Sequence, residues 1–516
     1  MPRSLSVPLF ALAVLAAAAA GCRPSGETGA RAPEPLPPHS NVLLITVDTL
    51  RADHLGSYGY ARDTSPHLDR LAAEGVRFAE PIVQWPKTGP SFASMFTATY
   101  PKDNGIVRRI GQPLPCRFRM LAEELSDAGY QTHAVIANGA LAADFYFDQG
   151  FDTYLEGWKI EPAEEGLDPI GAEQITRLSV GLLERIRAGE KPFFLWVHYV
   201  DPHFPYTPPG EWADRFQGDG LATTDRTVEV TDRPKQQMRG IGPDRVLDGR
   251  EDLAFYHARY DAEIAYNDHW IGALLAAAEE RGLMERTLTV VTSDHGESLG
   301  EHEYYFDHGR FGFETCLRVP LILHYPGVLE PSVDPAPVEL LHLAPTLLEA
   351  AGVELTEGTW MQGRTLTPRL RAAGGGPVAA AGVVPAGDAE GAADPGAAPS
   401  SPIAFSEAGW EAHNKWQKIA RGDRYKLIYA QTRPEQQWIG GPGVRFTLYD
   451  LAEDPGETVN VAEEHPEVFA ELQRELWAWE RADRFPVAVE PAAAACGDER
   501  TMEDETREVL EALGYL

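Results

Sequence analysis

Aspartate and histidine stand side by side twice in the stretch "VTSDHGESLGEHEYYFDHG", residues 291–309. The first pair, Asp294 and His295, follows an apolar run that is typical of a buried β-strand, and a second Asp-His pair thirteen residues later ends at His308. A carboxylate and an imidazole can bind one divalent cation together through oxygen and nitrogen ligands. Because Asp and His are also common in polar loops, one such pair alone is weak evidence for a metal site.

Further ligand candidates follow other apolar runs. Asp48 comes directly after "NVLLITV", and the stretch "HYVDPHFPY", residues 198–206, ends another run and carries Asp201 and His203. The carboxyl ends of parallel strands meet at one edge of a sheet, where ligands gather. We therefore expect Asp48, Asp294 and His295 to bind a divalent metal at such an edge.

A hydroxyl group with possible chemistry lies in "QWPKTGPSFASMFTATYP", residues 84–101, where Thr88 stands just before a predicted helix start at Pro90. The N-terminus of a helix attracts anions through its dipole and its unpaired N–H groups. A hydroxyl there could be a plain helix cap, and it could attack a substrate if a metal ion favoured its ionised form. We expect Thr88 to be the nucleophile and a further metal ligand.

Attack on an anionic ester needs groups that stabilise the charge of the transferred oxygens. Asn138, which follows another apolar run, His203 and His308 are the catalytic candidates for this role, together with backbone N–H groups at the helix start. Lys87 could bind the ester, and it could equally be a solvated surface lysine.

The composition limits the kinds of partner. The chain has 516 residues, which favours a large domain with a smaller one, and its formal net charge of −33 argues against a nucleic-acid surface. If the substrate is anionic, local cations or metal ions must overcome this charge at the site.

The N-terminus reads "MPRSLSVPLFALAVLAAAAAGC". Its apolar run is short for a bilayer span and is typical of a signal peptide. Residues 19–22 resemble a bacterial lipobox, in which Cys22 becomes lipidated, and a plain secreted chain is the alternative. We expect an extracytoplasmic protein in the periplasm or on the outer surface, anchored to the membrane by a lipid on Cys22.

Apolar runs alternate with helical patterns along most of the chain, for example at residues 65–76, 118–128 and 256–281. This order predicts an α/β fold with a parallel sheet between helices, and the short alternating runs after residue 402 predict a small antiparallel sheet with a helix. The expected parts are a signal peptide at 1–21, a flexible tether at 22–40, a catalytic α/β domain at 41–370, an Ala/Gly/Pro-rich flexible insertion at 371–402, a small α+β subdomain at 403–488 and a tail at 489–516.

Many ordered segments of residues 41–477 resemble the sulfatase family, within the alkaline phosphatase superfamily. They include "NVLLITVDTLRADHLGSYGY", "TGPSFASMFTATYP", "YDAEIAYNDHWIGALL", "VVTSDHGESLGEH" and "LYDLAEDPGETVNVAEEHPEV", and the tail "LEALGYL" is similar as well. The resemblance implies a large domain with a mixed, mostly parallel sheet, a small C-terminal sheet domain, and a divalent metal beside a covalent nucleophile.

The departures from the family pattern bear on function. Sulfatases carry a Cys or Ser, matured to formylglycine, two residues before the proline and an Arg two residues after it, whereas this chain has Thr88 and Phe92. Threonine cannot yield the aldehyde, so no formylglycine is expected. A lysine and histidine clamp is replaced by "VIANGALAAD", and the second of two frequent aspartates by Thr49.

Phosphatases and phosphonate hydrolases of the wider superfamily commonly use a metal-bound Thr or Ser directly, often beside two metals. By this resemblance Asp201, His203 and His308 could bind a second ion, although the spacing "DPH" differs from the usual D-x-x-x-H. The resemblance implies calcium for a sulfatase-like site, and zinc or manganese for a phosphatase-like one.

The sequence therefore favours a metal-dependent hydrolase of anionic esters with a Thr88 nucleophile. The resemblance favours sulfate esters and the nucleophile favours phosphate or phosphonate esters of a small molecule, a glycan or a lipid. The alternatives are an inactive sulfatase-like binding protein, and a transferase of phosphoryl-linked head groups.

Overall fold

The computed structural model describes residues 36–516 apart from gaps at 108–109, 163, 165, 187–190, 222–223, 233–237, 357–358, 373–375, 378–402, 411–414, 432–436, 439–440, 443–444, 483–499 and 514. The expected signal peptide, Cys22 and most of the expected tether and insertion lie outside these residues. Among the helices of the described part, none has the length and apolar character that crossing a membrane requires.

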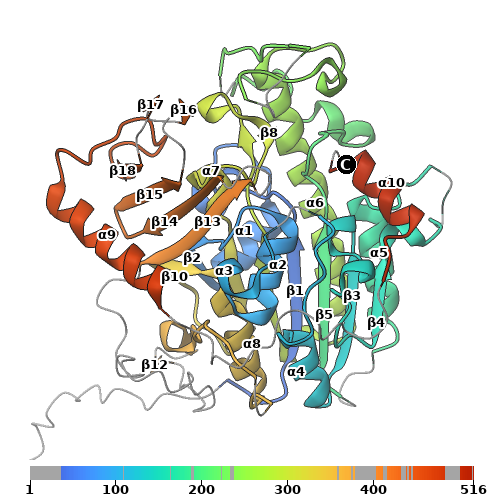
Figure 1. Cartoon of the computed structure of the whole chain (residues 1–516). Coiled ribbons are helices and arrows are strands. Elements are labelled where there is room, and N and C mark those ends of the chain that lie inside the picture. The colour runs from blue at the N-terminus through green and yellow to red at the C-terminus, as the bar shows by residue number, and fades with distance from the viewer. Residues whose placement is uncertain are drawn as a thin grey trace, which may run out of the picture.

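A large sheet of eight strands forms the centre of the molecule (Figure 1), in the order β10-β2-β9-β6-β1-β5-β3-β4. Strand β9 runs antiparallel to both of its neighbours, and the other pairs are parallel. The strands are β1 (Asn41–Val47), β2 (Val76–Ile82), β3 (Gln131–Ile136), β4 (Thr153–Glu156), β5 (Phe193–Tyr199), β6 (Thr287–Thr292), β9 (Leu321–His324) and β10 (Ser332–Glu339). The predicted mixed, mostly parallel sheet is confirmed.

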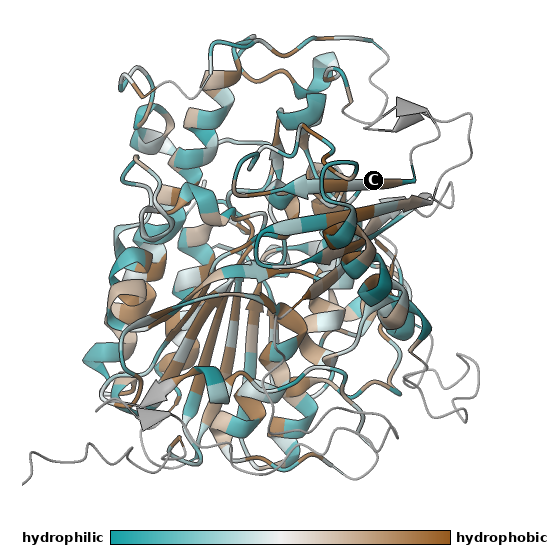
Figure 2. Cartoon of the chain, turned by 90° about the vertical axis from the view of Figure 1, so that its left-hand side faces the viewer, coloured by the Kyte–Doolittle hydropathy of each residue, from teal (hydrophilic) through white to brown (hydrophobic). Residues whose placement is uncertain are grey.

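The central strands are continuous apolar runs because both of their faces are covered. Every residue of β5 and β6 is buried, and so is every residue of β1 after Asn41. This pattern is typical of parallel sheets between helices. Figure 2 shows the apolar strands of the large sheet beside helices that carry both polar and apolar residues.

Two groups of helices cover the sheet. Helices α1 (Pro66–Glu74) and α5 (Ala172–Leu183) both contact α6 (Leu253–Glu280). Helices α2 (Thr88–Thr97), α4 (Leu121–Asp127) and α8 (Leu343–Ala351) contact one another. Helix α5 packs on β3 and β5, and α8 packs on β1. Short elements complete this part: α3 (Pro101–Asn104), α7 (Glu314–Leu317), β7 (Ser298–Leu299) and β8 (Tyr305–Asp307).

A smaller antiparallel sheet follows, as predicted. Its strands β13 (Ala404–Trp410), β14 (Lys415–Arg421), β15 (Tyr425–Gln431) and β18 (Phe446–Asp450) pair in that order, and helix α9 (Pro466–Arg481) packs on β14 and β15. Leu427, Leu448, Leu476 and Trp479 belong to a second apolar cluster, which also includes Tyr100 and Leu341 of the large domain. Two short antiparallel ladders pair β11 (Arg371–Ala372) with β12 (Gly376–Pro377) and β16 (Gln437–Trp438) with β17 (Gly441–Pro442).

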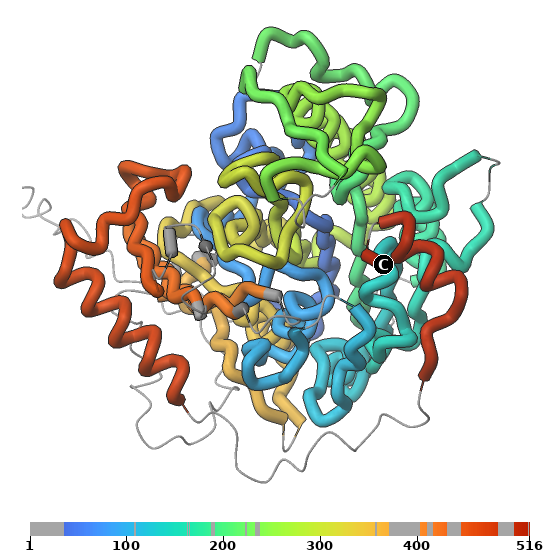
Figure 3. The backbone as a smooth tube through the Cα atoms, turned by 45° about the horizontal axis from the view of Figure 1, so that its top comes forward, coloured from blue at the N-terminus to red at the C-terminus, as the bar shows by residue number. Residues whose placement is uncertain are grey.

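Part of the expected tail is a docked helix. Helix α10 (Asp504–Ala512) lies beside the short helical turns η3 (Gly139–Leu141) and η5 (Gly157–Lys159), which follow β3 and β4. Figures 1 and 3 show α10 on the opposite side of the molecule from the small sheet.

A buried ion cluster fastens the small sheet to the large domain. The Lys426 ammonium of β15 is fully buried and lies 3.0 Å from a Glu314 carboxylate oxygen of α7 and 2.7 Å from a Glu457 carboxylate oxygen. A buried charge is costly unless it is paired, so these three residues depend on one another.

We expect Lys426→Ala to lower the free energy of unfolding by about 3–5 kcal/mol, because it removes the buried ammonium that pairs with both carboxylates. Urea unfolding measures this change. The matched control, Arg474→Ala, removes an exposed cation beside Glu475 on α9 and is expected to cost less than about 0.5 kcal/mol. Equal effects of the two variants would contradict a fastening role for Lys426.

Candidate active site

Three expected metal ligands meet at the carboxyl ends of β1 and β6. Asp48, Asp294 and His295 are fully buried, and each offers one ligand atom within 4.8 Å of the other two. The Nε2 atom of His295 lies 3.4 Å from Asp294 Oδ2 and 3.8 Å from Asp48 Oδ1. Because β1 and β6 are neighbouring parallel strands, their ends bring together residues that are far apart in the sequence.

The two loops that carry these ligands are hydrogen-bonded to each other. The Leu50 amide donates to Ser293 Oγ at 3.1 Å, and Ser293 Oγ donates to the carbonyl of His295 at 2.6 Å. Thr49 has a φ of 54°, which is unfavourable for a β-branched residue. The Tyr260 hydroxyl donates to the Thr49 carbonyl at 2.7 Å, so α6 holds this turn in place beside Asp48.

The electrostatics of this cluster fit a divalent cation. Burial, and then the charge of Asp48, raise the pKa of Asp294 well above its ordinary value. Asp294 Oδ2 has no hydrogen-bond partner among the described residues. His295 Nδ1 faces the Gly296 carbonyl at 2.9 Å and must donate to it, so the lone pair of the neutral ring is on Nε2, which faces both carboxylates. Two carboxylates and one imidazole nitrogen are suitable ligands for such an ion.

Thr88 lies beside this cluster. Helix α2 begins at Thr88, two residues earlier than the position of Pro90 suggests, so Thr88 belongs to the first turn. Its side chain is buried, and Oγ1 lies 3.3 Å from His295 Nε2. The hydroxyl is therefore at the anion-attracting end of a helix and within reach of the metal ligands.

Lys87, the residue before Thr88, is not a solvated surface lysine. It is 5% exposed, and its ammonium lies 5.6 Å from the centre of the Trp85 ring. An added Cβ on Gly309 would lie 2.6 Å from Lys87 Cγ, so the aliphatic stem packs closely against that loop. Its charge is thus held inside the protein near the start of α2.

Asn138 also reaches the cluster, from the end of β3. The Ala140 amide donates to Asn138 Oδ1 at 2.8 Å, which fixes the orientation of the side-chain amide. Nδ2 donates to Asp48 Oδ2 at 2.5 Å, so Asn138 holds one of the metal-ligand candidates.

Three further buried side chains lie next to the first cluster. His203, Glu297 and His308 each offer a ligand atom within 4.8 Å of the others, and the ring of His308 stacks on His295 with centroids 4.0 Å apart. Nδ1 of His203 faces the carbonyl of Phe204 at 2.7 Å, and Nδ1 of His308 faces that of Pro86 at 3.1 Å. In the neutral rings the lone pairs are therefore on the two Nε2 atoms, which lie 3.4 Å apart.

Asp201 lies elsewhere. Its carboxylate accepts a hydrogen bond of 3.0 Å from the amide of Ala172 at the start of α5, and the Asn267 side chain donates to its carbonyl at 2.6 Å. Burial raises the pKa of Asp201 to about 7. The structure thus groups His203 and His308 with Glu297 rather than with Asp201, because Asp201 stabilises the first turn of α5.

Residues that the sequence reasoning did not single out complete the site. Glu297 stands only two residues after His295 in the metal-ligand stretch, and the Tyr206 hydroxyl donates to its carboxylate. His198 Nε2 lies 3.6 Å from Asp48 Oδ2, and burial lowers the pKa of His198 to about 4. Tyr515 lies in the tail, and its hydroxyl contacts Thr88 Oγ1. The only sequence feature that pointed to this segment was the resemblance of "LEALGYL" to the family.

Phe92 explains one departure from the sulfatase pattern. Its ring is fully buried and packs against Trp196 and edge-on against His198, each with centroids 5.0 Å apart. The position at which sulfatases have an arginine is therefore part of the apolar core beneath the site.

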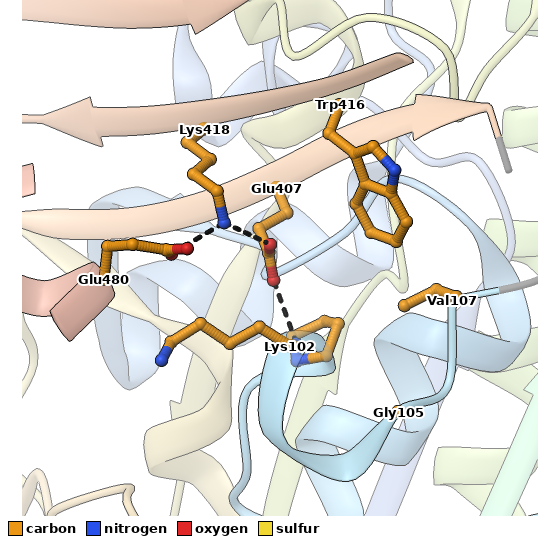
Figure 4. Close-up of a pocket in the computed structure, with 8 residues that line it drawn as sticks. Lys102, Gly105, Val107, Glu407, Trp416, Lys418 and Glu480 are labelled. Atoms are coloured by element: carbon orange, nitrogen blue, oxygen red, sulfur yellow. Dashed lines mark hydrogen bonds and ion pairs between the residues drawn. The ribbon is translucent and has the colours of Figure 1, made fainter. Parts of the chain in front are cut away.

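A cavity of about 530 Å³ lies apart from these clusters, between α3, the small sheet and α9 (Figure 4). Lys418 Nζ pairs with Glu407 at 3.2 Å and with Glu480 at 2.6 Å, and the amide of Lys102 donates to Glu407 at 3.0 Å. These lining groups bind one another, and the cavity contains none of the nucleophile or metal-ligand candidates.

The fold is that of known hydrolases. A phosphonate monoester hydrolase of Agrobacterium radiobacter has a TM-score of 0.63 and 23% identity, covering 85% of this chain and 96% of that chain. A protein solved in complex with its substrate D-glucosamine-2-N,6-O-disulfate has the same TM-score of 0.63 and 22% identity, covering 86% of this chain and 99% of that chain.

The sequence comparisons identify the family. The family model Sulfatase matches residues 40–353. An arylsulfatase of Clostridium perfringens is 27% identical in an alignment 372 residues long, which covers 61% of this chain and 76% of that protein. This chain belongs to the sulfatase family, so the resemblance found in the sequence is confirmed, and it is a hydrolase of that family.

Losing a residue that only supports a metal ligand typically weakens metal binding about 10–100-fold. We expect Asp294→Asn to weaken binding of a divalent cation by more than this. The reason is that Asp294 supplies a charged ligand atom of the first cluster. Metal content by elemental analysis, and the rise of the melting temperature with added Ca²⁺, Zn²⁺ or Mn²⁺, measure this loss. Asp201→Asn is the matched control and keeps its metal. Equal metal content of Asp294→Asn and the wild type would remove Asp294 from the ligand set.

Asp201 gives a pH dependence whose sign follows from its raised pKa. The pKa of this carboxyl group is about 7 in the folded chain, above the ordinary value of 3.8, so the folded state binds the proton more tightly than the unfolded state does. The wild type therefore loses stability as the pH rises from about 4 to 7.

Asp201→Asn does not titrate, so its free energy of unfolding relative to the wild type should rise across this range by about 2–4 kcal/mol and stay constant above about pH 8. Urea unfolding of the chelated proteins at several pH values measures this. Asp63→Asn, which removes the charge of an exposed carboxylate, is the control for the substitution itself. A constant difference for Asp201→Asn would contradict the raised pKa.

Proposed function

We propose that this sulfatase-family protein hydrolyses anionic esters with Thr88 as the nucleophile, and that phosphate or phosphonate esters are preferred over sulfate esters. The observation that carries the proposal is the position of Thr88 Oγ1, 3.3 Å from His295 Nε2 and beside Asp48 and Asp294. A threonine cannot form the aldehyde of a sulfatase, so the hydroxyl itself must attack.

A divalent cation held by Asp48, Asp294 and His295 would act as a Lewis acid and favour ionisation of the neighbouring hydroxyl. Thr88 Oγ1 attacks the phosphorus or sulfur atom, a bond to the ester oxygen breaks, and the leaving group takes a proton. Water then hydrolyses the ester formed on Thr88 and restores the hydroxyl. The start of α2 lies at Thr88, so the helix dipole favours negative charge on the transferred group there.

His203 and His308 face the first cluster and would stabilise charge on the transferred oxygens. We propose that they bind a second cation together with Glu297. The two Nε2 atoms lie 3.4 Å apart, and in the neutral rings both bear lone pairs, so a cation between them and Glu297 would bind to ligand atoms that already face one another. Glu297 Oε1, which has no hydrogen-bond partner among the described residues, supplies a negative ligand for that cation.

The names of similar proteins support both substrate classes. The phosphonate monoester hydrolase supports phosphorus chemistry, and the arylsulfatase and the protein bound to a glucosamine disulfate support a sulfate ester on a small molecule or glycan. For the choice of substrate we give the identity of the nucleophile more weight than the names of similar proteins, because the nucleophile reacts with the ester itself. The lipobox-like Cys22 supports an extracytoplasmic, lipid-anchored location.

Thr88→Ala should lower kcat/KM at least about 1000-fold on the preferred substrate, because it removes the attacking oxygen. The measurement compares a phosphonate monoester, a phosphodiester, a phosphomonoester and a sulfate ester, each with Ca²⁺, Zn²⁺ and Mn²⁺. Thr88→Ser should keep most of the activity. Thr97→Ala, at the other end of α2, is the matched control and should keep it as well.

Each other outcome has a defined meaning. Turnover that survives Thr88→Ala would remove Thr88 as the nucleophile. Faster Thr88-dependent turnover of the sulfate ester would overturn the preference for phosphorus. Absence of turnover with every substrate and metal would favour a binding protein, for which the apolar setting of Phe92 is the specific argument.

A further inference from the structure

A residue from the tail lies inside the active site. The Tyr515 hydroxyl oxygen is 3.1 Å from Thr88 Oγ1 and 3.0 Å from Asn138 Nδ2. Its ring stacks on His203, with centroids 5.1 Å apart and an angle of 24° between the planes. Tyr515 therefore contacts the proposed nucleophile and two of the groups around it.

The tail is held there by buried apolar contacts. Leu510 is fully buried, and Val509 and Leu513 are each 7% exposed. An added Cβ on Gly139 would lie 2.7 Å from Val509 Cγ1, so η3 and α10 are in close contact. The amide of Tyr515 donates to the Leu510 carbonyl at 2.8 Å, which turns the chain back after α10.

Polar contacts fasten the start of the same segment. The amide of Glu503 donates to Asp144 Oδ2 at 3.0 Å, and Arg500 pairs with Asp148 at 2.7 Å. Figure 3 shows α10 along the part of the chain that follows β3. These contacts make α10 a built part of the site and argue against a tail that must leave before substrate binds.

The hydrogen-bond polarity at Tyr515 follows from the fixed orientation of Asn138. Because Asn138 Oδ1 accepts from the Ala140 amide, the group facing Tyr515 is the amide nitrogen, which can only donate. The phenol oxygen accepts this hydrogen bond. The lone pair of the neutral His295 ring is on Nε2, 3.3 Å from Thr88 Oγ1, so the Thr88 O–H can donate to that nitrogen. With its own hydrogen directed at His295, Thr88 Oγ1 accepts from the Tyr515 O–H. The donors thus run from Asn138 through Tyr515 to the nucleophile.

We propose that Tyr515 is a further catalytic residue, whose phenol O–H stabilises negative charge on the Thr88 oxygen and on the adjacent oxygen of the transferred group. The inference rests on the proposed function of Thr88. A neutral phenol adds a donor without adding charge, and its ring lies against His203, where the transferred group would be bound. The proposal is a hydrogen-bonding role, so no proton leaves the phenol.

The test is Tyr515→Phe, which removes the hydroxyl and keeps the ring on His203. We expect kcat on the preferred substrate to fall about 100-fold, with KM changed less than about threefold. Melting temperature and metal content should equal those of the wild type. Leu516→Ala, at the neighbouring side chain that is 56% exposed, is the matched control and should leave all four values unchanged.

Binding of two oxyanions gives a readout that packing alone does not change. Sodium orthovanadate can take up the five-coordinate geometry of the transition state with Thr88, and inorganic phosphate remains tetrahedral. We expect Tyr515→Phe to weaken vanadate binding at least about tenfold and phosphate binding less than about threefold. Equal loss of both ligands would assign Tyr515 a general binding role and overturn the proposal.

The remaining outcomes separate this inference from the proposed function. An unchanged kcat together with unchanged vanadate binding would overturn the role of Tyr515 while leaving Thr88 as the nucleophile. A raised kcat/KM would also overturn it and identify the tail as an obstruction. If the wild type turns over no ester, the proposed function fails, and vanadate binding still decides whether Tyr515 supports the Thr88 oxygen.

Discussion

Two carboxylates forced together inside the protein are the constraint on which the site depends. Asp48 and Asp294 follow neighbouring parallel strands, so the register of β1 and β6 determines their approach. Neither carboxylate is exposed, and their mutual repulsion favours protonation or a bound cation. A divalent cation would offset the repulsion between the two carboxylates and would compensate for their loss of hydration. The eight-stranded sheet is rigid enough to maintain this arrangement, because its central strands are covered on both faces.

The protein is strongly acidic, yet its proposed substrate is an anion. Arg51, three residues after Asp48, does not serve the substrate, because its guanidinium pairs with Asp53 at 2.8 Å and with Glu301 at 2.7 Å. The groups directed at the Thr88 oxygen are instead the Tyr515 hydroxyl and the ring of His295, with the Asn138 amide behind them. In the proposed function, positive charge at the site would come from bound cations and from Lys87.

The sequence predicted the fold and the first cluster because both follow from local patterns. Apolar runs predict strands that are covered on both faces. A polar residue directly after such a run lies at the carboxyl edge of the sheet, and its position there does not depend on the conformation of the rest of the loop. Asp48, Asn138, Asp294 and His295 were predictable in this way. The start of α2 was placed two residues late, since a proline in the first turn does not fix which residue begins the helix.

Residues further along the loops could not be placed by the same argument. Asp201 and His203 are two positions apart, yet one side chain turns to α5 and the other to the site. Glu297 and Tyr515 reach the site only through tertiary packing, and no periodicity marks such contacts. The expected lipid anchor and most of the insertion at 371–402 remain predictions, because they lie outside the described residues.

Gly139 determines how closely α10 can pack beside the site. It carries no functional group, but the absence of a side chain there sets how near Val509 and Leu510 come to η3. A methyl group at this position would be too close to Val509 and would move α10 away from η3. Tyr515, which follows α10, would then move away from Thr88. The position of the Tyr515 hydroxyl at Thr88 thus depends on how closely α10 packs against η3.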